Sequence, residues 1–78
     1  MIEVNFLDAN GVKILSLNTI EDVKNFFQIN SGLSNVAALI FELMFKHHRC
    51  TINGNDYFFH KTHIDALGGM NTVSYSLL

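Results

Sequence analysis

The sequence predicts one α+β domain, and three observations support that prediction. Apolar and polar residues alternate near both ends of the chain, which is the pattern of half-buried strands. Asn-Gly pairs stand at 10–11 and 53–54, and this dipeptide is typical of hairpin turns. Between the pairs, apolar residues recur at helical spacing. The predicted order is strand, strand, helix, helix, strand, strand, short helix, strand. We therefore expect an antiparallel sheet, made of two hairpins and a C-terminal strand, with both central helices packed on one face.

The first hairpin is predicted to span residues 2–17. Ile2, Val4 and Phe6 alternate with polar residues, and a similar alternation returns after Gly11. Because both Asn and Gly tolerate a positive φ, the Asn-Gly pair favours a tight turn between the two strands.

The first central helix is predicted over residues 20–28. Asn18 or Thr19 can cap it by accepting backbone N–H bonds, and two acidic residues in its first turn suit the helix dipole. The segment Asn30-Ser31-Gly32 is expected to end this helix, because glycine adopts the left-handed conformation common after a helix.

The second central helix is predicted to start at the cap Ser34 and to end between Lys46 and His48. Its side chains are apolar on nearly every side, with Glu42 as the single acid. A surface helix usually buries one stripe, so a helix that is apolar all round must be covered all round. A chain of 78 residues has few other elements for this purpose. The segment therefore predicts an interaction surface that a second copy or another protein covers.

The remaining residues are predicted to form a second hairpin over 50–60, a helical turn over 63–67 and a strand over 71–78. Thr62 can cap the helical turn, and the glycine pair at 68–69 would end it. All elements belong to a single small domain, residues 1–78.

The composition excludes several classes of function. The net charge is −2, with five Lys plus Arg and seven Asp plus Glu, so we do not expect nucleic acid as a partner. Charged residues make up 15% of the chain, below the ~25% of typical soluble domains, which suits a surface that is partly an interface. Cys50 is the only cysteine, so we expect a reducing cytoplasm. The longest apolar run, 36–41, is far shorter than the ~20 residues of a membrane span.

Four histidines and one cysteine suggest a metal site as an alternative. Zinc takes four ligands from Cys and His, and Cys50, His60 and His63 could supply three, with His47 or His48 as the fourth. The spacing matches no established zinc finger, and these residues also suit a helix end and exposed loops. We therefore predict no cofactor.

Catalysis is not expected either. Cys50 near His47 and His48 could be imagined as a nucleophile with a base, but such a pair needs a third orienting group and a pocket that excludes water. No glycine-rich phosphate loop is present. The protein is predicted not to be an enzyme.

A winged helix-turn-helix is the second alternative. The order of helix 20–28, helix 34–46 and hairpin 50–60 resembles helix, helix and wing, and Gly32-Leu33-Ser34 resembles the turn before a recognition helix. The resemblance implies a DNA-binding transcriptional regulator. A recognition helix must offer polar and basic side chains to bases and phosphates, whereas this helix is apolar on an acidic protein.

The aromatic run Tyr57-Phe58-Phe59 completes the predicted interaction surface. Consecutive residues of a strand point to opposite faces, so this run must place rings on both faces of its sheet. We expect a small cytoplasmic protein-binding module, in which the contact residues are Phe41, Met44, Phe45, Tyr57 and Phe59. Its size and composition suit an inhibitor of a host protein from a phage or mobile element, of the anti-defence type, and a homodimer is the conservative version.

Overall fold

The computed structural model describes residues 2–29 and 35–77, and its elements confirm the predicted α+β class. In chain order they are β1 (Ile2–Leu7), β2 (Lys13–Leu17), α1 (Ile20–Phe27), α2 (Val36–Phe45), β3 (Arg49–Ile52), β4 (Asn55–Phe58), β5 (Lys61–Leu67) and β6 (Met70–Ser76).

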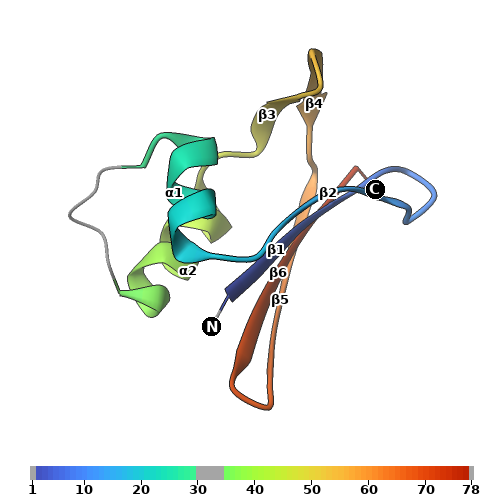
Figure 1. Ribbon diagram of the computed structural model, residues 1–78. Coiled ribbons are helices and arrows are strands. Elements are labelled where there is room, and N and C mark those ends of the chain that lie inside the picture. The colour runs from blue at the N-terminus through green and yellow to red at the C-terminus, as the bar shows by residue number, and fades with distance from the viewer. Residues whose placement is uncertain (1, 30–34, 78) are drawn as a thin grey trace.

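The strands form two sheets. A four-stranded sheet has the order β2-β1-β6-β5, and the hairpin β3-β4 forms a separate two-stranded sheet. Strands β1 and β6 are parallel, whereas the other neighbouring pairs are antiparallel. The structure thus refines the predicted single antiparallel sheet. The first and last strands meet in the middle of the larger sheet, and the second hairpin forms a separate unit above it (Figure 1).

The predicted helical turn over 63–67 is wrong, because these residues belong to strand β5. Gly68 and Gly69 have φ values of 60° and 79°, so the glycine pair forms a tight hairpin turn and does not end a helix. Strand β5 pairs with β6 from Lys61↔Ser76 to Leu67↔Met70.

The β1-β2 turn is held by an aspartate as well as by glycine. The Oδ1 atom of Asp8 accepts hydrogen bonds from the backbone N–H groups of Asn10 (2.8 Å) and Val12 (2.9 Å). Gly11 has a φ of 79°, whereas Asn10 is outside the left-handed region. The predicted hairpin over 2–17 is confirmed, with an irregular register next to Leu7.

The caps of the helices differ in part from prediction. Thr19 caps α1 and accepts from the N–H of Asp22 at 3.0 Å, which confirms one of the two predicted caps. Helix α1 ends at Gln28, which is left-handed with a φ of 56°, and the predicted stop at 30–32 lies outside the described residues. Helix α2 is capped by Asn35, while the predicted cap Ser34 also lies outside the described residues.

The hydrophobic core lies between the larger sheet, the two helices and the small hairpin. Both helices cover the same face of the sheet, as predicted (Figure 1). The sheet, the helices and the hairpin each contribute fully or almost fully buried side chains: Ile2, Val4, Phe6, Val73 and Tyr75 from the sheet, Val23, Leu39 and Leu43 from the helices, and Cys50, Ile52 and Phe59 from the hairpin and its exit.

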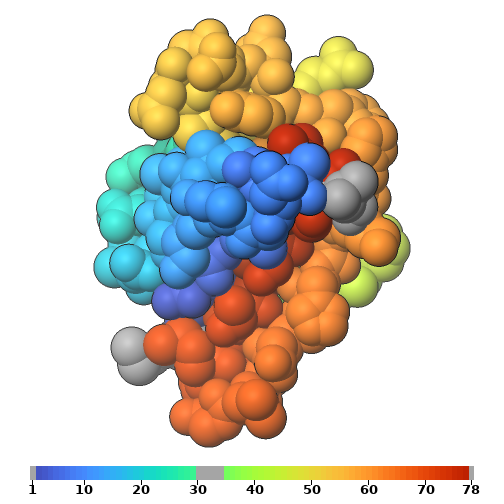
Figure 2. Space-filling model, turned by 90° about the vertical axis from the view of Figure 1, so that its right-hand side faces the viewer, coloured from blue at the N-terminus to red at the C-terminus, as the bar shows by residue number. Residues whose placement is uncertain are grey.

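The opposite face of the larger sheet is polar. Figure 2 shows this face, with β1 and β2 in blue, β6 in red and β5 in orange at its centre. On it, the side chain of Asn5 donates to Glu3 (2.9 Å) and accepts from the hydroxyl of Ser16 (2.8 Å). Neither helix in the described part of the chain has the length and apolarity that crossing a membrane requires.

Candidate functional site: the exposed face of helix α2

Helix α2 leaves three large apolar side chains in solvent. Phe41 is 65% exposed, Phe45 is 64% exposed and Met44 is 43% exposed. Residues three and four positions apart lie on one side of a helix, and the rings of Phe41 and Phe45 are 4.9 Å apart between centroids. Leu39 and Leu43 are fully buried on the other side. We call Phe41, Met44 and Phe45 the α2 face.

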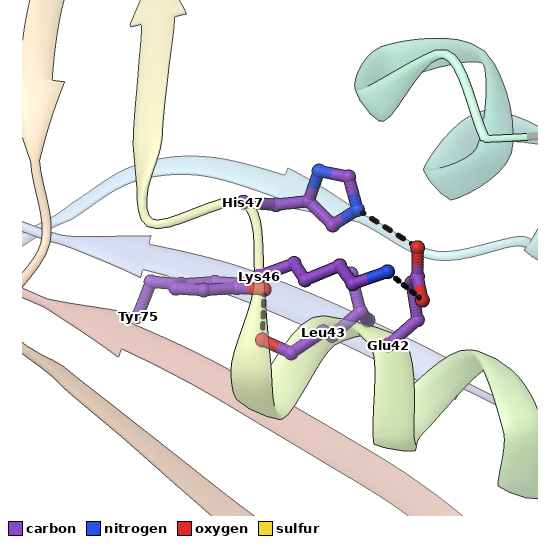
Figure 3. Close-up of polar contacts among 5 residues, drawn as sticks. All are labelled: Glu42, Leu43, Lys46, His47 and Tyr75. Carbon is purple, nitrogen blue, oxygen red and sulfur yellow. Dashed lines mark hydrogen bonds and ion pairs between the residues drawn. The ribbon is translucent and has the colours of Figure 1, made fainter.

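The polar side chains near the end of α2 contact one another. Glu42 lies 3.4 Å from the ammonium nitrogen of Lys46 and 3.5 Å from Nε2 of His47 (Figure 3). His47 has a φ of 66°, a left-handed conformation that turns the chain from α2 into β3. The positive charge of Lys46 at the end of the helix is therefore partly balanced by Glu42.

A buried tyrosine fixes the last turn of α2 to the larger sheet. The hydroxyl of Tyr75, on β6, donates a 2.7 Å hydrogen bond to the carbonyl oxygen of Leu43 (Figure 3). The last carbonyls of a helix have no partner within it, so this bond satisfies one of them. Burial raises the pKa of Tyr75, which keeps its hydroxyl protonated as a donor. The α2 face is thus presented by a helix with a fixed position on the sheet.

Tyr57 and Phe59 were predicted to point outward from their strand, and this prediction is wrong because they face the core. Phe59 is fully buried, Tyr57 packs half-buried against the core, and Phe58 is the exposed ring at 51%. The reason is the pairing of Tyr57 with Cys50, because directly opposed residues share one face of the hairpin and Cys50 faces the core. Phe58 lies on the outer face, where the guanidinium of Arg49 is 5.6 Å from its ring centroid.

The predicted zinc ligands are not brought together. The thiol of Cys50 donates to the carbonyl oxygen of His47 at 3.1 Å. His60 lies beside the exposed ring of Phe58, at 5.2 Å between centroids, and His63 is exposed on β5. His48 points to the larger sheet, where its Nε2 is 2.9 Å from the hydroxyl of Thr62. In the described residues no group of three or more His, Cys, Asp or Glu side chains is arranged to hold a metal.

The thiol of Cys50 is held in its neutral form. Burial raises its pKa from the ordinary 9.0 to about 11. A thiolate is the reactive form of cysteine, so we expect the folded protein to react with iodoacetamide at pH 8 much more slowly than the urea-unfolded chain does. Equal rates for the two states would contradict this prediction.

The same shift predicts a loss of stability in alkali. Because the folded pKa of Cys50 is the higher one, ionisation favours the unfolded chain. The contribution of Cys50 is complete below pH 9 and declines as the pH rises toward 11. Urea midpoints measured at pH 7, 9 and 10.5 should therefore fall over the last interval, and Cys50→Ala should show a smaller fall.

A groove lies beside strand β3. It has a volume of about 450 Å³ and lies between the end of α1 and the strand; its lining residues are Phe26, Phe27, Gln28, His47, Arg49, Cys50 and Thr51. Neither this groove nor the exposure of Phe58 was predicted. The exposure of Phe58 could have been predicted from the alternation of Arg49-Cys50-Thr51-Ile52. Cys50 and Ile52 are the apolar residues of this strand and mark its inward face, whereas Phe58 pairs with Arg49 on the outward face.

Searches against protein-family models, curated proteins and solved structures found no match to the chain.

Proposed function

We propose that the protein is a small, non-enzymatic protein-binding module and that the α2 face binds another protein. The observation that carries this proposal is the stripe of Phe41, Met44 and Phe45, three large apolar side chains side by side in solvent. Aromatic residues and methionine are enriched in the cores of protein interfaces, where charged residues are depleted. Contiguous exposed apolar surface of this kind typically marks an interaction site.

A DNA-binding role for α2 has less support. The exposed stripe carries no cation, and the one lysine at the end of the helix, Lys46, is paired with Glu42. Phosphate contacts by basic residues supply most non-specific affinity for DNA, and the whole chain has a net charge of −2. The winged helix-turn-helix is therefore the weaker alternative.

The identity of the partner stays a prediction. An inhibitor of a host protein would use the α2 face against a complementary apolar groove. A homodimer would cover the same face twice by two-fold symmetry.

A pair of double variants tests the proposal. Phe41→Ser with Phe45→Ser removes the two exposed rings, whereas Val12→Ser with Leu67→Ser removes exposed apolar groups from two hairpins. Val12 and Leu67 are 60% and 73% exposed, so the second pair is matched in exposure. Each tagged protein is used to capture partners from a lysate of the organism that encodes it, and the captured protein is purified and titrated by calorimetry.

We expect one protein to bind the wild type and the Val12/Leu67 variant in a 1:1 complex. The Phe41/Phe45 variant should lose at least about tenfold in affinity, because buried aromatic anchors dominate interface energies. Equal affinities of all three proteins would refute the α2 face as the contact. Sedimentation showing a dimer of the wild type that the Phe41/Phe45 variant loses would assign the face to self-association instead.

A further inference from the structure

Within residues 2–29 and 35–77, strand β3 has a free edge. It belongs to a two-stranded sheet and pairs there with β4 on one side only. An unpaired strand edge presents backbone N–H and C=O groups that can pair with another extended chain. In Figure 1, β3 lies between β4 and helix α1, so the free edge faces the end of that helix.

The register of the hairpin identifies which backbone groups are free. In an antiparallel pair, opposed residues alternate between exchanging hydrogen bonds and exchanging none. The N–H of Phe59 donates to the carbonyl of His48 at 2.8 Å, so His48 and Phe59 are a hydrogen-bonded pair. Every second pair after it exchanges hydrogen bonds as well, namely Cys50 with Tyr57 and Ile52 with Asn55. The N–H and C=O groups of Arg49 and Thr51 therefore point away from β4. The described part of the chain offers neither of them another backbone partner.

The groove beside β3 runs along these free groups. Arg49 and Thr51 line it from the strand, and Phe26 and Phe27 line it from the end of α1. The two phenylalanine rings also pack in the core, where each contacts Phe6. A chain lying along the edge of β3 would thus find hydrogen-bonding groups on one side and apolar side chains on the other.

The lining of the groove includes one permanent cation, Arg49, and a histidine, His47, but no acid. One acid stands beside the lining, because Asp56 accepts a 2.6 Å hydrogen bond from the hydroxyl of Thr51. Arg49 forms no ion pair within the described residues, whereas His47 is near Glu42. By contrast, the edge strand β5 carries charges of both signs, Lys61 and Asp65, a common protection of strand edges.

We propose that the free edge of β3 binds an extended acidic peptide segment of another protein as an added third strand. Backbone groups of the peptide pair with Arg49 and Thr51. A carboxylate of the peptide lies at the guanidinium of Arg49, and an apolar side chain enters the groove against Phe26 and Phe27. Strand addition of this kind draws affinity from main-chain hydrogen bonds and specificity from alternate side chains. The site is separate from the α2 face.

A synthetic peptide tests the proposal directly. The probe is the acetylated and amidated heptapeptide Val-Thr-Val-Glu-Val-Thr-Val, and its control carries lysine in place of glutamate. Binding is followed by NMR, through amide shifts and amide hydrogen exchange of the full chain. In the free protein the amides of Arg49 and Thr51 should exchange quickly, and those of Cys50 and Ile52 slowly. Saturating peptide should slow exchange at Arg49 and Thr51 by at least about tenfold.

Three variants separate the backbone from the charge. Thr51→Pro removes the free N–H and should weaken binding about fivefold, while Thr51→Val loses only the side-chain bond to Asp56 and should bind as the wild type does. The glutamate peptide should bind about threefold more tightly than the lysine peptide, and Arg49→Glu should invert that order.

Several results would overturn the proposal. One is the absence of saturable shifts at millimolar peptide, and another is equal binding of the two peptides to wild type and Arg49→Glu. A third is a dimer in which Arg49 and Thr51 are protected without peptide, because a second copy would then occupy the edge. The Phe41/Phe45 variant should bind the peptide normally, so this test and that of the α2 face can fail separately.

Discussion

Replacing Phe6 by alanine is expected to lower the free energy of unfolding by about 3–5 kcal/mol, which is the cost of removing a large ring from a packed core. Phe6 is fully buried at the centre of an aromatic cluster. Its ring is stacked on that of Tyr75 at 5.2 Å with an interplanar angle of 8°, and it lies 5.3 Å from both Phe26 and Phe59. Sheet, helix α1 and the exit of the small hairpin therefore meet on this one side chain.

The loss is large relative to the whole stability, because a core of this size supplies about 3–5 kcal/mol. We expect Phe6→Ala to be largely unfolded at 37 °C by circular dichroism and to lose its cooperative urea transition. Phe58→Ala is the matched control, since Phe58 is exposed and its loss should cost below about 1 kcal/mol. A Phe6→Ala protein with the midpoint of the wild type would show that the three parts of the core do not meet on this ring.

The first two hairpins could be predicted because a short sequence motif, Asn-Gly, specifies their turns. Asn53 and Gly54 have φ values of 53° and 80°, as a two-residue turn with both residues left-handed requires. The glycine pair at 68–69 does the same for β5 and β6, but its flanking residues also fit a helical turn. Tertiary pairing decides in favour of the strand over the helical turn, because β5 pairs with β6 along its whole length.

The arrangement of the sheets was beyond the sequence pattern. Alternation shows that a segment has two faces, but it does not identify the neighbouring strand. The parallel contact of β1 with β6 joins the two ends of the chain, and no local signal encodes it. The same limit applies to the groove, because its two walls come from α1 and β3.

The sequence predicted the exposed residues of α2 correctly but not those of the aromatic strand. The outward direction of Phe41, Met44 and Phe45 follows from the helical period once the buried side is known. In the aromatic strand the inward and outward residues are the reverse of the prediction. The partner strand holds the missing information, because Cys50 and Ile52 mark the inward face and their pairing places Phe59 inside and Phe58 outside.

A comparison of Leu39→Ala with Phe41→Ala tests which side of α2 packs on the sheet. Both residues are large and apolar, and they stand two positions apart in a helix whose sequence shows no clear polar side. Leu39 is fully buried and Phe41 is 65% exposed. We expect Leu39→Ala to lower the free energy of unfolding by about 2–5 kcal/mol, because it leaves a cavity in the core. Phe41→Ala should change it by less than about 1 kcal/mol.

Urea unfolding followed by circular dichroism measures both changes, with the slope of the transition as a check that cooperativity is kept. The ratio of the two losses in free energy of unfolding, for Leu39→Ala and for Phe41→Ala, is the informative quantity. Alanine has a higher helix propensity than either residue, so neither loss can come from a weaker helix. Similar losses for both variants would mean that Phe41 is covered in solution, as a stable dimer through the α2 face requires. The effect of Phe41→Ala would then depend on protein concentration, because dissociation accompanies unfolding of a dimer. A loss at Phe41 that stays constant from micromolar to millimolar protein would instead place its ring within the core of the single chain.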